Sequence, residues 1–391
     1  MMQLINLFKL QRWKITFACS ASDSEFSFDI VAAGIDKVTI ELNKESFDHF
    51  VKELQPSIVL FDRFMTEEQF GWRVAEQCPG ALRIIDTEDL HCLRYARQQA
   101  FKEKREFVLS DLNNEHAKRE IASILRSDLS LIISEYEMSI LQHYFKVDEN
   151  LLHYVPFMLE SQTETKLQTL PTFEERTHFI SIGNFLHEPN WNSVLYLKQE
   201  IWPLIRKELP QAELYVYGAY PSQKVLELNQ PKDGFIIKGR ANEVKTVMSN
   251  ARVCLAPLRF GAGIKGKLID AMQYGTPSVT TSIGAESMHG SFEWNGIIAN
   301  NAHQFAEAAV TLYNSKDLWL KSQLNGITII NNNYNSQKHG AALLDKLLST
   351  QLNLEAHRAT NFMGSLLMHH TLSSTKYMSR WIEEKNKRMA D

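Results

Sequence analysis

Glycines and lysines are concentrated in one stretch of this chain in an arrangement that suits an anionic ligand. The stretch runs from Leu255 to Ser282 and reads LAPLRFGAGIKGKLIDAMQYGTPSVTTS. Glycines at 261, 263 and 266 leave backbone N–H groups uncovered, and Lys265 and Lys267 stand among them. The apolar spacing that follows predicts a helix, whose N-terminus carries a partial positive charge. Bare N–H groups, a helix N-terminus and two ammonium groups together favour the binding of a diphosphate.

Two further side chains extend this pattern. Arg259 precedes the glycines and brings a third positive charge, which is repulsive unless an anion relieves it. Asp270 follows in the predicted helix, where a carboxylate can accept hydrogen bonds from ribose hydroxyls. The alternative is an ordinary strand–helix–strand crossover with solvated lysines and with glycines that serve turns only. The order of lysines, acid and a Gly-x-Pro exit favours the ligand site.

A second polar cluster, Asp86-Thr-Glu-Asp-Leu-His-Cys-Leu-Arg94, follows an apolar run in the first half. His91 is a candidate catalytic residue that contacts a sugar or accepts a proton, with Asp89 or Glu88 orienting its ring. The same cluster also suits a helix N-terminus in which its first two residues are the cap and its acids occupy the first turn. The two interpretations are compatible.

The elements that must position these residues alternate between strand and helix patterns. In the first half, apolar runs predict strands at 14–19, 37–42, 57–61, 82–86 and 129–134, and helical spacing occurs at 2–8, 46–54, 67–77, about 89–126 and 139–145. Such alternation predicts a largely parallel sheet with helices on both faces. Asp62 and Asp86 end two strands, as residues at the carboxyl edge of a sheet do, although Asp62 with Arg63 also suits a simple ion pair.

A polar stretch without an apolar period, residues 161–175, indicates an interdomain linker. A second alternating set follows, with strands at 178–182, 213–217, 235–238, 253–256 and 278–280 and helices at 192–208 and 317–345. We therefore expect an α/β fold with two Rossmann-like domains, residues 1–160 and 176–350, followed by C-terminal helices in 351–391.

The segment 255–282 resembles the donor-binding signature of GT-B glycosyltransferases, specifically of glycosyltransferase family 4. In that family a Pro-x-x-x-Gly-x-Gly-x-x-x-Lys loop precedes a Glu-Ala-Met/Leu-x-x-Gly-x-Pro-Val-Val helix and strand. The fuller family motif has two glutamates eight positions apart; here Asp270 stands at the second and Ala262 at the first. The resemblance implies a ribose contact by Asp270 and the loss of a carboxylate contact to the donor sugar. Backbone N–H groups of Gly261–Gly263 are expected to replace that contact.

Other segments resemble family positions too. Ser181-Ile-Gly-Asn-Phe-Leu-His-Glu-Pro-Asn190 is similar to the form Gly-x-x-x-x-x-Pro-Asn, with Asn190 as a helix cap. Gly218 and Lys238-Gly-Arg240 lie where the family places the nucleobase, and Glu286 is a candidate sugar or loop contact. The cluster with His91 is similar to the family segment Asp-x-x-Asp-Leu-His-x-x-Arg. The donor-binding residues implied are Gly183, Asn184, Arg259, Gly261, Gly263, Lys265, Lys267 and Asp270.

The resemblance implies two Rossmann-like domains that face a cleft, with the last helix crossing back to the first domain. It further implies transfer of a sugar from a nucleotide-diphosphate sugar to a glycan or glycolipid acceptor, with retention of anomeric configuration, in polysaccharide biosynthesis. The sequence contains no Asp-x-Asp metal motif, so neither a metal ion nor another cofactor is expected.

Two alternatives remain. A nucleotide-sugar epimerase of the same fold needs a catalytic carboxylate pair beside the donor sugar, and Ala262 argues against one. A non-catalytic nucleotide-sugar-binding subunit is favoured by the start of the chain. The chain begins with a helix where the family begins with a strand and a glycine-rich loop, so we expect that the first strand is missing or that the start of the chain is late.

Length and composition exclude several other classes of protein. A chain of 391 residues is long enough for two cores, and a formal net charge of −4 gives no basis for nucleic-acid binding. Four cysteines without a Cys-x-x-Cys pair fit buried thiols in a reducing cytoplasm, with neither zinc nor disulfides. The amphipathic N-terminus has no apolar h-region, so we do not expect it to be a secretory signal, and no segment approaches ~20 apolar residues. We expect a cytoplasmic protein, for which any contact with the inner face of the membrane is peripheral.

Overall fold

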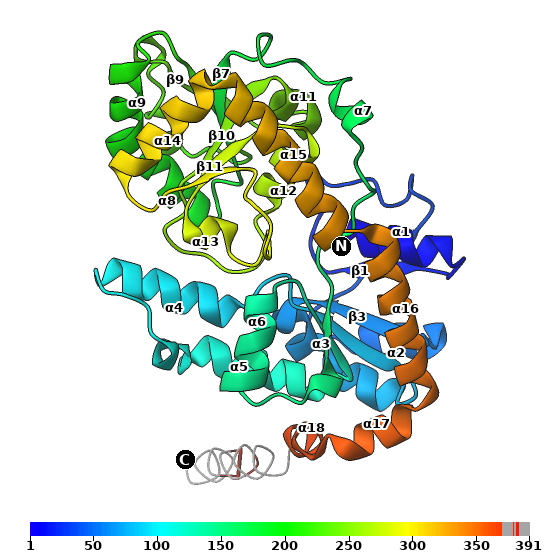
Figure 1. Cartoon of the computed structure of the whole chain (residues 1–391). Helices are drawn as coiled ribbons and strands as arrows, with labels where there is room; N and C mark the ends of the chain where they lie inside the picture. The colour runs from blue at the N-terminus through cyan, green and yellow to red at the C-terminus, as the bar shows by residue number, and fades with distance from the viewer. Residues whose placement is uncertain (370–377, 379–380, 383–391) are drawn as a thin grey trace.

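The computed structural model describes residues 1–369, 378 and 381–382, and Figure 1 shows their arrangement. Two α/β halves lie one above the other in this view, and the chain passes from the first to the second along α7 (Glu164–Leu167). The last long helices return from the second half to the first. The described residues therefore have the two Rossmann-like halves that the alternating pattern predicts.

Four parallel strands form the main sheet of the first half, in the order β3-β4-β5-β6. They are β3 (Ile58–Asp62), β4 (Leu82–Asp86), β5 (Leu129–Ile132) and β6 (Leu152–Tyr154). The apolar runs that form the central strands are buried because helices cover both faces, as is usual for parallel sheets. Asp62 pairs in register with Asp86, so both strand ends lie at the same edge of the sheet.

A separate two-stranded sheet lies at the start of the chain. Its strands, β1 (Thr16–Cys19) and β2 (Asp36–Thr39), pair in parallel with each other. The helix before them, α1 (Met2–Leu10), buries Leu4 in one cluster with Leu82 and Ile84 of the main sheet. The expectation that a strand is missing from this half stays a prediction.

Helices cover the first half, and the helical region predicted at about 89–126 contains two separate helices, α4 and α5. The helices are α2 (Ser46–Leu54), α3 (Arg63–Gln77), α4 (His91–Lys102), α5 (Glu115–Arg126) and α6 (Glu135–Ser139). A short 3₁₀ turn at Leu109–Leu112 separates α4 from α5. Asn114 then starts α5, because its side-chain oxygen accepts a hydrogen bond of 3.0 Å from the N–H of Ala117.

The second half contains a six-stranded parallel sheet in the order β12-β11-β10-β7-β8-β9. Its strands are β7 (His178–Ile182), β8 (Leu214–Tyr217), β9 (Phe235–Gly239), β10 (Ala251–Ala256), β11 (Ser278–Thr280) and β12 (Gly296–Ile298). Every strand predicted for this half is present, and β12 adds an edge that the sequence pattern did not indicate. β7 and β10 lie at the centre, and Ile180 and Val253 are fully buried there.

The helices of the second half place the glycines and lysines at the carboxyl edge of this sheet. They are α8 (Glu188–Tyr196), α9 (Trp202–Glu208), α10 (Gln223–Leu226), α11 (Val244–Ser249), α12 (Gly266–Gln273), α13 (Ser282–Ala285), α14 (Ala302–Asn314) and α15 (Lys316–Asn333). The helix predicted at 192–208 begins earlier, at Glu188, and contains a π-helical turn at Leu197–Ile201.

The C-terminal helices cross back onto the first half (Figure 1, orange to red). They are α16 (Ser336–Leu352), α17 (Leu354–Thr360) and α18 (Phe362–Met368). Leu343 and Leu347 of α16 are buried in the same cluster as Leu4 and Leu82. The helical character predicted for the rest of 351–391 lies outside the described residues at 370–377, 379–380 and 383–391.

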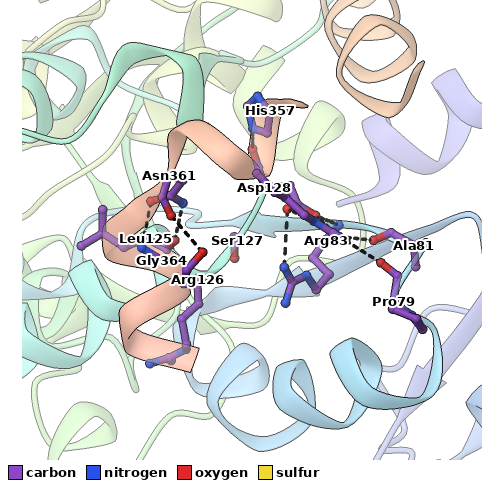
Figure 2. A network of polar contacts seen from close by, with 12 residues as sticks. Pro79, Ala81, Arg83, Leu125, Arg126, Ser127, Asp128, His357, Asn361 and Gly364 are labelled. Carbon is purple, nitrogen blue, oxygen red and sulfur yellow. Dashed lines mark hydrogen bonds and ion pairs between the residues drawn. The ribbon is translucent and has the colours of Figure 1, made fainter. Parts of the chain in front are cut away.

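A polar network fastens α17 and α18 to the first half, as Figure 2 shows. Arg358 donates to both carboxylate oxygens of Asp128 at 2.7 Å and to the carbonyls of Pro79 and Ala81. Asn361 donates to the carbonyl of Leu125 at 2.7 Å. Asp128 is almost fully buried, and it also faces Arg83 at 3.5 Å. α17 and α18 are therefore an integral part of the first half.

Candidate functional site

The glycine loop, residues 257–265, connects the end of β10 to the start of α12. Gly263 has a φ of 63°, a left-handed conformation that glycine adopts without strain. A Cβ at this position would also lie 2.8 Å from the Cβ of Asp89 in the first half. Glycine at 263 is thus required both by the turn and by the close approach of the other half.

Lys267 lies in the first turn of α12 and meets the end of β7. Its Nζ donates to Oδ1 of Asn190 at 2.7 Å. A Cβ on Gly183 would lie 2.9 Å from that Nζ and 2.7 Å from the side-chain amide of Asn190, so glycine at 183 lets both side chains approach the end of β7. Burial lowers the pKa of Lys267 to about 8, which leaves the amine charged at neutral pH. Lys267 has no carboxylate partner in the part of the chain that the structure describes.

Asp270 stands one turn further along α12, on the same side of the helix as Lys267. Burial raises the pKa of its carboxyl group to about 6. Among the described residues, none forms a hydrogen bond or an ion pair with this carboxylate. A half-buried carboxylate without a protein partner is free to accept hydrogen bonds from a ligand.

The other two predicted cations of the loop are occupied by protein groups. Arg259 donates to Oδ1 of Asn192 at 2.8 Å, and its guanidinium lies 4.2 Å from the ring centroid of Tyr196. Lys265 is buried and donates to the carbonyl of Gly263 at 2.7 Å. Arg259 also lies 3.8 Å from the carboxylate of Glu200. The expectation that three unpaired charges repel one another in this loop is therefore wrong, and among the described residues Lys267 is the cation of the loop that no carboxylate pairs.

The residues predicted near β7 converge on Lys267 through Asn190. Asn184 accepts, at its carbonyl, a hydrogen bond of 3.0 Å from Nδ2 of Asn190. The expectation that Asn190 caps the helix is wrong, because α8 begins at Glu188 with His187 at the N-cap position. Asn190 instead links the turn after Gly183 to the amine of Lys267.

His91 and Asp89 lie together on the first half. Nε2 of His91 is 3.4 Å from Oδ1 of Asp89, and Arg94 donates to the other oxygen of that carboxylate. Burial, with a contribution from Arg94, lowers the pKa of His91 to about 4. The imidazole is therefore neutral at pH 7 and able to accept a proton, with Asp89 beside it.

The start of α4 is capped differently from the prediction. Leu90 occupies the N-cap position and has no capping side chain. The carboxylate of Glu120 accepts hydrogen bonds of 2.9 Å from the N–H groups of His91 and Cys92 instead. The N–H of Leu90 donates at 3.0 Å to Oε1 of Glu137. Both caps come from distant helices, so no local motif could have indicated them.

Arg94 and His187 are site residues that sequence reasoning missed. His187 lies within electrostatic reach of Arg94, Asp89 and Lys267. It therefore stands where the His91 side of the first half meets the Lys267 side of the second. The sequence signal for His187 was its position within the segment Ser181–Asn190, three residues before Asn190.

The remaining predicted contacts have protein partners. Glu286 binds the guanidinium of Arg97 in the first half at 2.7 and 2.8 Å. Arg240 lies over the ring of Phe26, 4.3 Å from its centroid. Arg63 pairs with Asp62 at 2.9 Å, which agrees with the simple ion pair.

The described residues contain neither a candidate metal-binding cluster nor a helix that could span a membrane. No group of three or more His, Cys, Asp or Glu side chains in the described ranges could hold a metal ion. No helix among them is long and apolar enough to cross a membrane. The four cysteines are free thiols, and Cys19 is half-buried where a buried thiol was expected.

The second half of the chain is similar to known proteins. Residues 176–315 match the family described as Glycosyl transferases group 1. A Klebsiella pneumoniae relative, an uncharacterized 44.6 kDa protein in the cps region, is 25% identical over 164 residues. That alignment covers 40% of this chain and 42% of the relative, so the match spans less than half of either length.

Solved structures resemble the whole arrangement. Anabaena HepE in complex with UDP and glucose has a TM-score of 0.68 at 11% identity, covering 89% of this chain and 95% of HepE. Sucrose-phosphate synthase from Thermosynechococcus elongatus has a TM-score of 0.64 at 16% identity, covering 90% and 92%. Staphylococcus aureus TarM has a TM-score of 0.59 at 13% identity, covering 78% of this chain and 58% of TarM. These likenesses establish the GT-B fold.

Proposed function

We propose, from a GT-B fold whose second half matches group 1 glycosyl transferases, that this chain is a glycosyltransferase with a nucleoside-diphosphate sugar as donor. The acceptor we propose is a glycan or a glycolipid. The Klebsiella relative's place in a cps region is in keeping with a role in polysaccharide biosynthesis. UDP is the first nucleotide to test, because the solved HepE and TarM complexes contain it.

The observation that carries this proposal is the environment of Lys267. A charged amine without a carboxylate partner among the described residues lies in the first turn of α12, close to Gly183 at the end of β7. A diphosphate bound there would be stabilised both by the positive charge of the amine and by the partial positive charge of the helix N-terminus. Asp270, one turn along, is placed to accept hydrogen bonds from the ribose of the same nucleotide.

The chemistry follows from where charge develops during transfer. As the glycosidic bond to the diphosphate breaks, negative charge grows on the leaving oxygens, and Lys267 with the α12 N-terminus would stabilise it. This takes the role that a metal ion has in other folds, so we propose a metal-independent reaction. Neutral His91, held beside Asp89, would contact the sugar or accept the acceptor's proton. We propose retention of configuration on family likeness.

The test is thermal-shift stabilisation by UDP, GDP, dTDP and their common sugars, for wild type and Lys267→Ala. A ligand at about 100 times its dissociation constant stabilises a protein by about 2.7 kcal/mol. We expect one nucleotide family to raise the melting temperature of wild type and to have no effect on Lys267→Ala. Lys245→Ala, an exposed lysine of α11, is the matched control and should respond as wild type does.

A response of Lys267→Ala equal to that of wild type would place the nucleotide elsewhere. No response of wild type to any nucleotide would remove the donor site altogether. Once a nucleotide is found, release of the free nucleoside diphosphate from its sugar form, with and without acceptor, tests transfer itself.

A further inference from the structure

The tip of the glycine loop is held by side chains of the other half. Oε1 of Glu137, on α6, accepts a hydrogen bond of 2.7 Å from the N–H of Gly263. Arg97, on α4, donates at 2.9 Å to the carbonyl of Gly261. The two contacts flank Ala262 on both sides. The N–H of Gly263, expected to face the donor sugar, is therefore already occupied.

Charges from the two halves are complementary around this tip. The first half supplies Arg97 and Glu137, and the second supplies Lys265 and Glu286. Arg97 forms two hydrogen bonds with Glu286, and Lys265 lies within electrostatic reach of both carboxylates. Burial raises the pKa of Glu137 and lowers that of Lys265. We call these four residues the interdomain clasp.

Packing reinforces the clasp at the same place. Ala262 packs against an apolar cluster of the first half that includes Leu90 and Leu93. The N–H of Tyr136 donates at 3.0 Å to Oγ of Ser287, just beyond Glu286. A glutamate at 262 would have to enter the apolar cluster, so alanine at this departure from the family motif fits the contact.

The two carboxylate oxygens of Glu137 differ in their contacts. Oε2 is buried and has no hydrogen-bond partner among the described residues. Leaving a buried carboxylate oxygen unsatisfied is costly, and natural proteins keep such groups where function requires them. The other oxygen, Oε1, links the two halves, because it accepts hydrogen bonds from the N–H of Gly263 in one half and the N–H of Leu90 in the other.

We propose that Glu137 and Arg97 are positioning residues: from the first half they set the shape of the glycine loop in the second. When the first half packs against the second, these contacts order the loop that leads into α12 and Lys267. The inference deepens the proposed function and rests on it for its meaning, because the loop matters as part of the donor site. The shape of the loop itself can be measured without any donor.

The first experiment is amide hydrogen exchange on the full, unliganded chain. Glu137→Leu removes the acceptor at similar volume, and Glu137→Gln keeps one acceptor oxygen while removing the charge. We expect exchange in the peptide spanning 259–267 to rise about tenfold in Glu137→Leu, the equivalent of about 1.4 kcal/mol, and to stay near wild type in Glu137→Gln.

Glu120→Leu is the matched control, because Glu120 also caps α4 from a buried position but does not touch the glycine loop. It should raise exchange at the start of α4 and leave residues 259–267 unchanged. If the loop peptide in Glu137→Leu exchanges as it does in wild type, the proposal is overturned. It is overturned as well if Glu120→Leu loosens the loop equally, because the effect is then one of general stability.

The second experiment measures the dissociation constant of UDP by calorimetry. We expect Glu137→Leu to weaken UDP binding at least fivefold, about 1 kcal/mol, and Glu137→Gln to remain within twofold of wild type. Arg97→Lys, which cannot hold Glu286 and Gly261 at once, should weaken it too and serves if Glu137→Leu does not fold. Unchanged affinity in the folded variants would contradict positioning.

The two experiments separate the two proposals. If wild type binds no nucleotide while the loop loosens in Glu137→Leu alone, the donor site fails and the clasp remains a structural device. If wild type binds UDP and the loop does not loosen, the donor site stands and the clasp fails.

Discussion

Lys267 is a buried amine that must stay charged to bind a diphosphate. Its pKa of about 8 is below the value of about 10.4 for an exposed lysine, because burial disfavours the charged form. The free protein therefore loses this charge as the pH rises through 8. A bound diphosphate favours the protonated amine, so nucleotide binding takes up a proton above that pH.

The first prediction follows from this linkage. The affinity for UDP should fall as the pH rises above 8, approaching tenfold per pH unit. Lys267→Arg should bind with nearly constant affinity from pH 7 to 9, because a guanidinium keeps its charge. Calorimetric titrations at several pH values check this, and an identical pH profile for the two proteins would argue against Lys267 as the titrating ligand.

Asp270 makes the opposite kind of contribution, because its carboxylate costs the free protein stability. Its folded pKa of about 6 lies above the value of about 3.9 expected for an unfolded chain. Between these values the folded state binds more protons than the unfolded state, so stability falls as the pH rises. The cost is fully present above pH 6.

Asp270→Asn should therefore melt at a higher temperature than wild type at pH 7.5, with the difference disappearing below pH 4. The same substitution should weaken UDP binding, since an amide is a poorer acceptor for ribose hydroxyls than a carboxylate. Melting curves at both pH values, together with calorimetry, test the two effects. A variant less stable at pH 7.5 would show that the carboxylate has a stabilising partner.

At the scale of elements, Arg358 makes several of the contacts in the network that fastens α17 and α18 (Figure 2). Arg358 joins Asp128 and two carbonyls that lie beside the start of β4. Asp128 is buried, so removing Arg358 leaves it with Arg83 alone among the described cations. Arg358→Met should lower the free energy of unfolding by about 2 kcal/mol, somewhat below a fully buried pair because Arg358 is partly exposed.

Denaturation in urea measures this loss. Lys338→Met, on the exposed face of α16, is the control and should change stability by less than about 0.5 kcal/mol. Equal stability of Arg358→Met and wild type would mean that the other contacts of these helices, such as the hydrogen bond from Asn361 to Leu125, hold them without Arg358.

At the scale of the whole molecule, the two halves meet through opposite charges. Arg97→Glu or Glu286→Arg alone would place like charges in contact, and each should lower stability by about 3 kcal/mol. The double swap, Arg97→Glu with Glu286→Arg, should recover part of that loss because the pair is restored in reverse. Melting temperatures of the four proteins check the cycle. Additive losses in the double variant would exclude direct coupling between these residues.

Much of the architecture follows from patterns within single segments. Apolar runs at 178–182 and 278–280 predict strands that the structure has with the same bounds, because a buried parallel strand needs a continuous apolar run. The boundary between α4 and α5 was missed, because Asn114 was not taken as a cap. The short edge strand β12 was missed too, because three residues carry little pattern.

The sequence by itself determined the glycine loop, Lys267 on the helix after it, and Asp270 one turn later. These relations are local: residue spacing places the side chains on a strand end, a turn and a helix face. Tertiary structure alone decided which cations are free. Arg259 and Lys265 look equivalent to Lys267 in the chain, yet only folding brings Asn192, Glu286 and Glu137 to the first two. Charge pairing depends on distances in space between residues far apart in the chain, and sequence separation does not encode those distances.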